Sequence, residues 1–324
     1  MKNFLSVLLI AMMLVFPATA AAQLTSADFS DVRGLVAAQD IELMANLGVM
    51  IGTGTNGQGL RLFSPDENVT RAQLAVVLQR TFQLDYGPIR FIKPPLATDY
   101  YRDVDNQAWY ADGLVMCAIN NIFANADNFY PDRAVNRIEI AQSVYRSFNA
   151  KGISVPMIMI MPIFEDTRAL TQEQINAIIF VNNTGIMQTN SPYFRPAEGL
   201  NRGELAQVLS RCVSLISIND NYNGQEYRVP AGQTFIIALS SNPTTGFSWT
   251  LKNAGDGQLI TPVVNFYLSD AAQNQSLVGQ GGKEYWQFKA LQAGSTDLQL
   301  IYARPWESVQ PAQFFNLKVV VTQP

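Results

Sequence analysis

Residues 63–74 read FSPDENVTRAQL, and this stretch is the strongest indication of how the N-terminal part of the chain folds. It recurs as FYPDRAVNRIEI at 129–140 and as FRPAEGLNRGEL at 194–205. Self-similarity at a fixed spacing indicates repeated structural units that stack on one another. The chain is therefore expected to contain three copies of one unit.

Each copy carries a helix start signal. Thr70, Asn136 and Asn201 are polar N-cap residues, and each is followed three residues later by glutamine or glutamate. This is the capping-box pattern, in which two side chains satisfy backbone N–H groups of the first turn. Apolar residues at helical spacing follow, so we expect a helix after each cap and another amphipathic helix earlier in each unit.

A unit of two helices cannot bury its own apolar face, so we expect the three units to share one core. The units span about 29–84, 100–149 and 162–216, within one domain at 27–216. The segment 88–98, with two consecutive prolines, is expected to be an exposed connection.

The N-terminus has the pattern of a signal peptide. Lys2 precedes an apolar stretch from Phe4 to Phe16, and small residues follow at Ala20–Ala22. We expect residues 1–22 to be cleaved near this site on export. No later segment approaches the roughly 20 apolar residues that a membrane-spanning helix needs, so no transmembrane segment is expected.

The composition excludes several classes of function. The 324 residues carry a net charge of −4 without a run of Lys or Arg, which argues against a nucleic-acid partner. Histidine is absent, so a Ser-His-Asp triad, a Cys–His pair and imidazole metal ligands are excluded. The acidic residues are scattered and are expected on the solvated surface. We therefore expect a protein that is not an enzyme and uses no cofactor or metal.

The chain has two cysteines, Cys117 and Cys212. Two cysteines do not form the disulfide framework of a small secreted domain. Both fall on predicted helices of different repeats, so buried thiols are the expectation. One disulfide stays open as an alternative if the two Cα atoms lie within about 7 Å.

The sequence pattern changes after residue 216. A polar segment at 217–224 lacks helical periodicity and is predicted to be a linker. Within 225–324, apolar and polar side chains alternate in short runs, at 234–239, 247–252, 284–290, 296–302 and 315–321. Such runs, divided by turn residues, are typical of an antiparallel sandwich. We expect a multidomain chain in which an all-α repeat domain precedes an all-β immunoglobulin-like sandwich.

Three segments between the predicted strands stand out: Asn242-Pro243-Thr244-Thr245-Gly246, Gly279-Gln280-Gly281-Gly282 and Arg304-Pro305-Trp306. Each one alone is an ordinary turn, bulge or strand end. Alternate connections of a sandwich lie at the same end, so the three segments are expected to cluster as antibody loops do. They would form one binding edge.

The repeats resemble the S-layer homology (SLH) repeat in their aromatic-x-Asp-Val opening at 29–32 and 101–104, their F-x-P-D turn and their T-R-A-Q helix start. The resemblance implies binding to a secondary polysaccharide of the bacterial cell wall through Arg71, Arg137 and Arg202, with Trp109 matching the family's tryptophan. The second repeat departs from the family at 121–124, where NIFA replaces glycines. The alternative is that each arginine pairs with a neighbouring carboxylate.

The order N-P-T-T-G-F, G-x-G-G, R-P-W over about 223–324 resembles the chagasin family of cysteine-protease inhibitors. The resemblance implies a wedge that fills the active-site cleft of a papain-like protease without being cleaved. The residues implied to bind the protease are Asn242, Pro243, Thr244, Thr245, Gly246, Phe247, Gly279, Gly281, Gly282, Arg304, Pro305 and Trp306.

Together the two resemblances imply an exported, cell-surface inhibitor of papain-like cysteine proteases. The alternative is a structural surface-layer or adhesive protein whose β domain binds a ligand other than a protease. An enzyme is the weakest hypothesis, since no acid/base pair can be placed.

Overall fold

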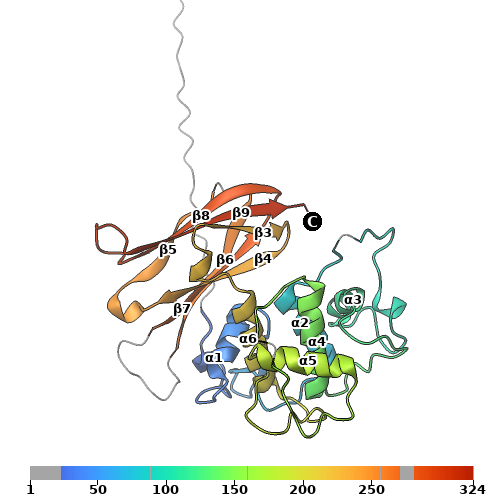
Figure 1. Ribbon diagram of the computed structural model, residues 1–324. Helices are drawn as coiled ribbons and strands as arrows, with labels where there is room; N and C mark the ends of the chain where they lie inside the picture. The colour runs from blue at the N-terminus through green and yellow to red at the C-terminus, as the bar shows by residue number, and fades with distance from the viewer. Residues whose placement is uncertain (1–22, 88, 159, 256, 271–280, 324) are drawn as a thin grey trace, which may run out of the picture.

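The chain forms an N-terminal helical domain and a C-terminal β sandwich that lie against each other (Figure 1). The computed structural model describes residues 23–87, 89–158, 160–255, 257–270 and 281–323. The expected signal peptide at 1–22, and Gly279 of the glycine-rich segment, lie outside the described residues.

The described helical domain holds six α-helices, α1 (Ala38–Asn46), α2 (Arg71–Phe82), α3 (Ala111–Ile119), α4 (Arg137–Ala150), α5 (Gln172–Asn183) and α6 (Arg202–Ile216), and a short hairpin of β1 (Gly54–Thr55) and β2 (Arg61–Leu62). The predicted capping boxes are present at α2, α4 and α6. In each, the side chain of Thr70, Asn136 or Asn201 accepts a hydrogen bond from the backbone N–H three residues later. The side chain of that later residue accepts one from the cap's own N–H, so the sequence signal and the helix start coincide.

An aspartate near the start of each unit fixes the turn before its second helix. Asp31, Asp103 and Asp166 each accept hydrogen bonds from two consecutive backbone N–H groups of the F-x-P turn. The second donor residue has a positive φ in all three units, at Ser64, Tyr130 and Arg195. Residues other than glycine seldom adopt a positive φ, so the turn is strained. The hydrogen bonds to the aspartate help to hold it in this conformation.

The three units close into a ring through their helix-start arginines. Each arginine Nε donates a hydrogen bond to the carbonyl of the turn phenylalanine in the next unit, and its guanidinium lies over that ring. The pairs are Arg71 with Phe129 at 2.6 Å, Arg137 with Phe194 at 2.8 Å, and Arg202 with Phe63 at 2.9 Å. The helices pack in the same cyclic order, α2 with α3, α4 with α5, and α6 with α1. One hydrophobic core therefore runs through the described helical domain.

Both cysteines are free and buried, so the expectation of buried thiols is confirmed. Cys117 lies on α3, where its Sγ donates a hydrogen bond to the carbonyl of Ala75 at 3.3 Å. Cys212 lies on α6. Burial raises the pKa of both thiols, which keeps them protonated and unreactive.

The C-terminal domain is a sandwich of two sheets. One sheet has the order β3 (Gln225–Pro230), β9 (Gln313–Thr322), β8 (Gly294–Ala303), β5 (Ser248–Asn253), and the other has the order β4 (Thr234–Ser241), β7 (Gly282–Ala290), β6 (Ile260–Ser269). The pairings are antiparallel except for β3 with β9, which is parallel. The five predicted runs fall on strands, apart from Phe247, which directly precedes β5. Strands β3 and β6 were not predicted.

The sheet β4-β7-β6 contributes side chains to two hydrophobic cores, one on each face. Phe235 and Phe288 point into the sandwich core, whereas Ala238, Phe266 and Tyr285 belong to the core of the helical domain. Figure 1 shows α1 and α6 next to this sheet, and α1 contacts β6. The two domains therefore share an apolar interface in addition to their covalent connection.

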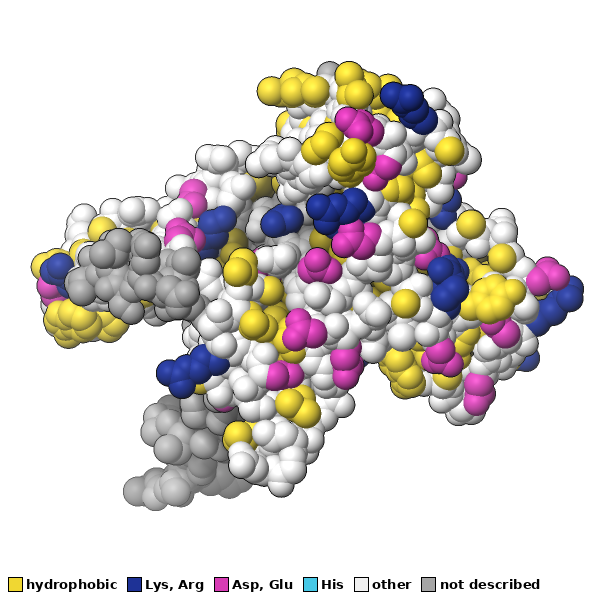
Figure 2. All heavy atoms as spheres, turned by 90° about the horizontal axis from the view of Figure 1, so that it is seen from below, with side chains coloured by type: hydrophobic (Ala, Val, Ile, Leu, Met, Phe, Trp, Pro, Cys, Tyr) yellow, Lys and Arg dark blue, Asp and Glu magenta, His cyan; other side chains and the backbone are white. Residues whose placement is uncertain are grey.

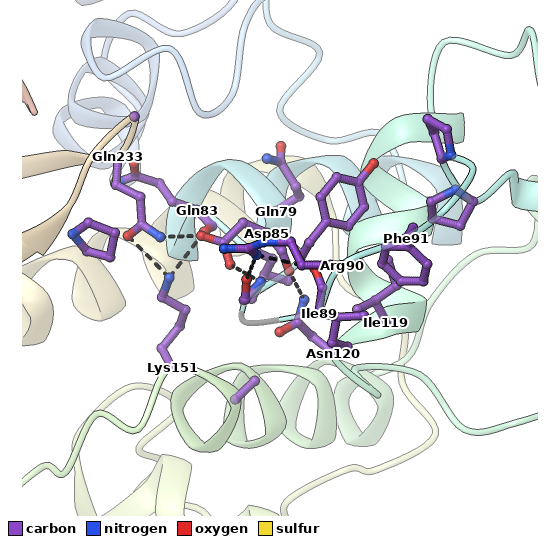
Figure 3. Close-up of a pocket in the computed structure, with 18 of the residues that line it drawn as sticks. Gln79, Gln83, Asp85, Ile89, Arg90, Phe91, Ile119, Asn120, Lys151 and Gln233 are labelled. Carbon is purple, nitrogen blue, oxygen red and sulfur yellow. Dashed lines mark hydrogen bonds between the residues drawn. The ribbon is translucent and has the colours of Figure 1, made fainter. Parts of the chain in front are cut away.

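A polar clasp joins the domains beside this interface (Figure 3). The side-chain amide of Gln83, just after α2, forms two hydrogen bonds with the backbone of Thr234 on β4. Gln233 bonds to Asp85, and the Lys151 ammonium donates to Gln233 Oε1 at 3.3 Å. An open hollow of about 880 Å³ between the helices and the β3–β4 turn is lined by residues that include Gln83, Asp85, Lys151 and Gln233.

Acidic and basic side chains are mixed on the face shown in Figure 2, without a broad basic patch. Within the described part, the connection after α2 exposes Ile89, Phe91 and Ile92. In the part of the chain that the structure describes, we find no helix with the length and hydrophobicity to cross a membrane.

Candidate functional site

The loop between β4 and β5 is a tight turn that satisfies its own polar groups. Pro243–Thr245 form one 3₁₀ turn. The Thr244 hydroxyl donates to Asn242 Oδ1 at 2.6 Å, and the Thr245 hydroxyl donates to the Asn242 carbonyl at 2.6 Å. Gly246 ends the turn at a φ of 82°, which favours glycine. The N-P-T-T-G sequence thus builds a loop with a defined shape.

The segment after β8 packs directly on this loop. Arg304 Nε donates to the Thr245 carbonyl at 3.0 Å, and its guanidinium lies 4.5 Å from the centroid of the Phe247 ring. Trp306 covers Gly246 while 70% of its own surface stays exposed. The structure therefore brings the first and third predicted segments together, with a large aromatic ring at their outer edge.

The glycine-rich segment is described only at its end, where Gly281 leads into Gly282, the first residue of β7. A Cβ at residue 282 would lie 2.1 Å from the Leu268 carbonyl of β6, so this position requires glycine. A Cβ at residue 281 would lie 3.4 Å from the carbonyl of Ser241, at the base of the first loop. The described end of the second segment therefore reaches the same edge as the other two.

Two residues beneath the loops were missed by the sequence analysis. Tyr302 of β8 stacks on Phe247, and its hydroxyl accepts a hydrogen bond from the Asn242 N–H at 2.8 Å. Glu284 of β7 is 6% exposed and accepts hydrogen bonds from both stems of the first loop. Desolvation raises the pKa of Glu284, against the effect of these hydrogen bonds. A carboxylate inside the predicted strand 284–290 was the signal that could have identified it.

The four residues that the SLH resemblance singled out do not form one site. The three arginines lie at separate junctions between units, and burial lowers the pKa of each guanidinium. Arg71 pairs with Glu139 at 2.7 Å, which is the alternative that the sequence left open. Arg202 is 6% exposed, and Trp109 is 67% exposed.

One junction between units is hollowed. Arg71, Arg133, Arg146 and Glu139 line an open groove of about 390 Å³. Arg133 also bonds to Glu139, so that carboxylate is shared by two arginines. The groove therefore carries more positive than negative charge among these four side chains.

Known proteins resemble the two domains separately. A family model described as "Chagasin family peptidase inhibitor" matches residues 228–319, and one described as "S-layer homology domain" matches residues 28–75. Chagasin from Trypanosoma cruzi is 33% identical over 89 residues, which cover 26% of this chain and 77% of chagasin. The surface-layer 125 kDa protein of Lysinibacillus sphaericus is 29% identical over 141 residues, which cover 43% of this chain and 10% of that protein. The crystal structure of a cysteine protease inhibitor from Entamoeba histolytica is 21% identical and covers 32% of this chain and 92% of its own, with a TM-score of 0.27.

The match to the chagasin family model spans all three segments of the β sandwich, and the SLH match spans most of the first helical unit. Through its C-terminal domain the chain belongs to the chagasin family of peptidase inhibitors, and it carries an S-layer homology domain on the N-terminal side.

Proposed function

We propose that this protein is held at a bacterial cell surface by its helical domain, about 27–216, and blocks papain-like cysteine proteases with its β domain, about 225–324. The observation that carries the proposal is the exposed edge made by residues 242–247 and 304–306. The hydrogen bonds within this edge order it before any partner arrives, which reduces the entropy lost on binding.

The side chains at the edge suit a narrow cleft. Thr244 and Thr245 are small, and their hydroxyls are already bonded within the loop, so entering the cleft leaves no hydroxyl newly unpaired. Trp306 is a large rigid group of the kind that dominates binding energy at interfaces. Occlusion of the cleft needs no nucleophile in the inhibitor.

The proposal is tested by titrating papain with the chain from residue 23 onward and following the inhibitor on a gel. Both domains are kept because they share an interface. Reversible inhibition by an uncut chain is the expected result. A folded chain that leaves papain and related proteases fully active would contradict it.

A variant with a longer first loop tests whether residues 242–247 form the wedge. Two glycines inserted between Thr244 and Thr245 would lengthen the 3₁₀ turn and move the Thr245 hydroxyl away from the Asn242 carbonyl. We expect inhibition to fall by a larger factor than for any single substitution at the edge. An insertion variant that inhibits as well as the wild type would rule out this loop as the wedge.

For the surface attachment, we propose that the groove at Arg71 takes an acidic segment of the wall polysaccharide. Arg133 is the suited contact because its side chain is 46% exposed. Its guanidinium already donates two hydrogen bonds to Glu139, so it would attract a carboxylate or phosphate of the polymer chiefly through its charge. The chain should sediment with purified cell walls, and Arg133→Ala should sediment less. Arg195→Ala, at an exposed arginine in the F-x-P turn of the third unit, is the matched control. Absence of sedimentation by the wild type would count against wall attachment.

The similarity to a surface-layer protein also favours a second candidate, a structural or adhesive surface protein. The two candidates differ in the papain assay. A chain that sediments with walls but inhibits no papain-like protease would favour the structural or adhesive role.

A further inference from the structure

The carboxylate of Glu284 lies between the two sheets, directly beneath the loop 242–247. It projects from β7, the central strand of the sheet β4-β7-β6, and the residue is 6% exposed. A buried carboxylate is costly unless hydrogen bonds compensate its lost hydration. The hydrogen bonds that Glu284 accepts therefore have to account for its burial.

Its hydrogen bonds reach both stems of the loop. The hydroxyl of Ser241, the last residue of β4, donates to Oε1 at 2.6 Å. The backbone N–H of Trp249, the second residue of β5, donates to Oε1 at 3.1 Å and to Oε2 at 3.0 Å. Ser241 and Trp249 belong to different sheets, so one side chain ties together the two strands from which the loop emerges.

The same residue lies next to the second segment of the edge. Glu284 follows Gly282 by two positions on β7, so its backbone continues the glycine-rich segment. Among the ion pairs of the described residues, none involves Glu284, and the donors named above are neutral groups of the loop stems. The carboxylate therefore accepts its hydrogen bonds from the loop stems and forms no ion pair among the described residues.

We propose that Glu284 is a positioning residue that holds the first loop in its binding shape and sets its place relative to the glycine-rich segment. The inference rests on the proposed function, since the loop is taken as the protease-binding wedge. Without Glu284, the Trp249 N–H loses a buried acceptor and the two stems lose their common link. The loop then samples more conformations, and only a fraction of the molecules is ready to bind.

The test compares Glu284→Ala and Glu284→Gln with the wild type in the chain from residue 23 onward. We expect the inhibition constant for papain to rise roughly tenfold for the alanine variant, equivalent to about 1.4 kcal/mol. The glutamine variant keeps one acceptor oxygen and should recover most of the inhibition. Val321→Ala is the control that distinguishes positioning of the loop from a general loss of stability. It removes buried side-chain atoms at the opposite end of the sandwich, where Val321 of β9 pairs with Gly294 and Val229. This control should lower the melting temperature without changing the inhibition constant of the folded protein.

Amide hydrogen exchange gives a readout that needs no protease. In Glu284→Ala, exchange should accelerate in the peptide covering 242–249 and stay unchanged in β9. An alanine variant with unchanged inhibition and unchanged exchange in this peptide would overturn the inference, as would Val321→Ala raising the inhibition constant equally. If the wild type inhibits no protease, the proposed function fails, and the exchange data alone decide whether Glu284 holds the loop.

Discussion

The indole ring of Trp306 lies against Gly246 so closely that a Cβ at residue 246 would stand 2.6 Å from Cη2 of the ring. The contact joins the first and third segments of the edge that we propose binds the protease. It also explains why glycine follows the threonines, because the same residue has a φ of 82°. One position thus meets two separate requirements.

Substitution at this position tests the contact. Gly246→Ala must move the Trp306 ring and places a side chain at a left-handed φ, which costs about 1–2 kcal/mol. We expect the inhibition constant for papain to rise by roughly tenfold or more. The control is Gly232→Ala, which has a φ of 90° and open space around its Cβ at the far β3–β4 turn. Equal inhibition constants for the two variants would contradict the importance of the Trp306 contact.

Trp306 itself is expected to be an anchor. Trp306→Ala should weaken inhibition by about 2 kcal/mol, or roughly 30-fold. Because the side chain is 70% exposed, the free energy of unfolding should change little. Trp109→Ala is the matched control, at a tryptophan that is 67% exposed on the helical domain. An unchanged inhibition constant in Trp306→Ala would remove this residue from the interface.

The ring of arginines predicts that lysine cannot replace Arg202. Its Nε and Nη2 donate to the carbonyls of Phe63 and Ile51 at 2.9 and 3.0 Å, and it is 6% exposed. A single ammonium cannot reproduce this fork, so Arg202→Lys should leave a buried carbonyl unpaired and cost about 1–3 kcal/mol. Urea denaturation measures the loss. Arg195→Lys, at an exposed arginine, should change stability by less than about 0.5 kcal/mol, and a similar value for Arg202→Lys would contradict a structural role.

The hydrogen bonds of Gln83 to the β domain predict a contribution to thermal stability. Gln83→Ala removes two hydrogen bonds to the Thr234 backbone, so calorimetry should show a melting temperature lower by about 2–5 °C. Residue 83 has a φ of 47°, and glutamine and alanine bear similar backbone strain there. This strain therefore cancels when the melting temperatures of the wild type and Gln83→Ala are compared. Gln79→Ala, one helical turn earlier on the rim of the same hollow, is the control. If these hydrogen bonds do not contribute to stability, both variants will have the melting temperature of the wild type.

The local elements could be predicted from the sequence, whereas their partners could not. Thr70 and Gln73 form a signal within four residues, so the start of α2 was readable directly. That Arg202 would reach back to Phe63 depends on the closure of three units into a ring, which no local pattern reports. Strand β6 was missed because its side chains serve two cores and lose a clean alternation. Glu284 was overlooked for a related reason, since its hydrogen-bond donors come from two other strands.

The pH dependence of stability gives a last test of the buried carboxylate. Burial raises the pKa of Glu284 above its value in the unfolded chain, about 4.3. The folded state therefore binds this proton more tightly, and the wild type loses stability as pH rises from the unfolded value through the raised folded one. Glu284→Gln has no such proton. The difference in unfolding free energy, variant minus wild type, should increase with pH across this window and become constant above it.

Urea denaturation between pH 4 and pH 8 measures this difference, and the remaining carboxylates cancel because both chains share them. Tyr267, which is coupled electrostatically to Glu284, does not disturb the window, since burial raises its pKa above the usual tyrosine value. A constant difference would mean that desolvation and the hydrogen bonds balance, so that folding leaves the pKa of Glu284 unchanged. A difference that falls with pH would mean that the hydrogen bonds from Ser241 and Trp249 outweigh burial and lower the pKa instead.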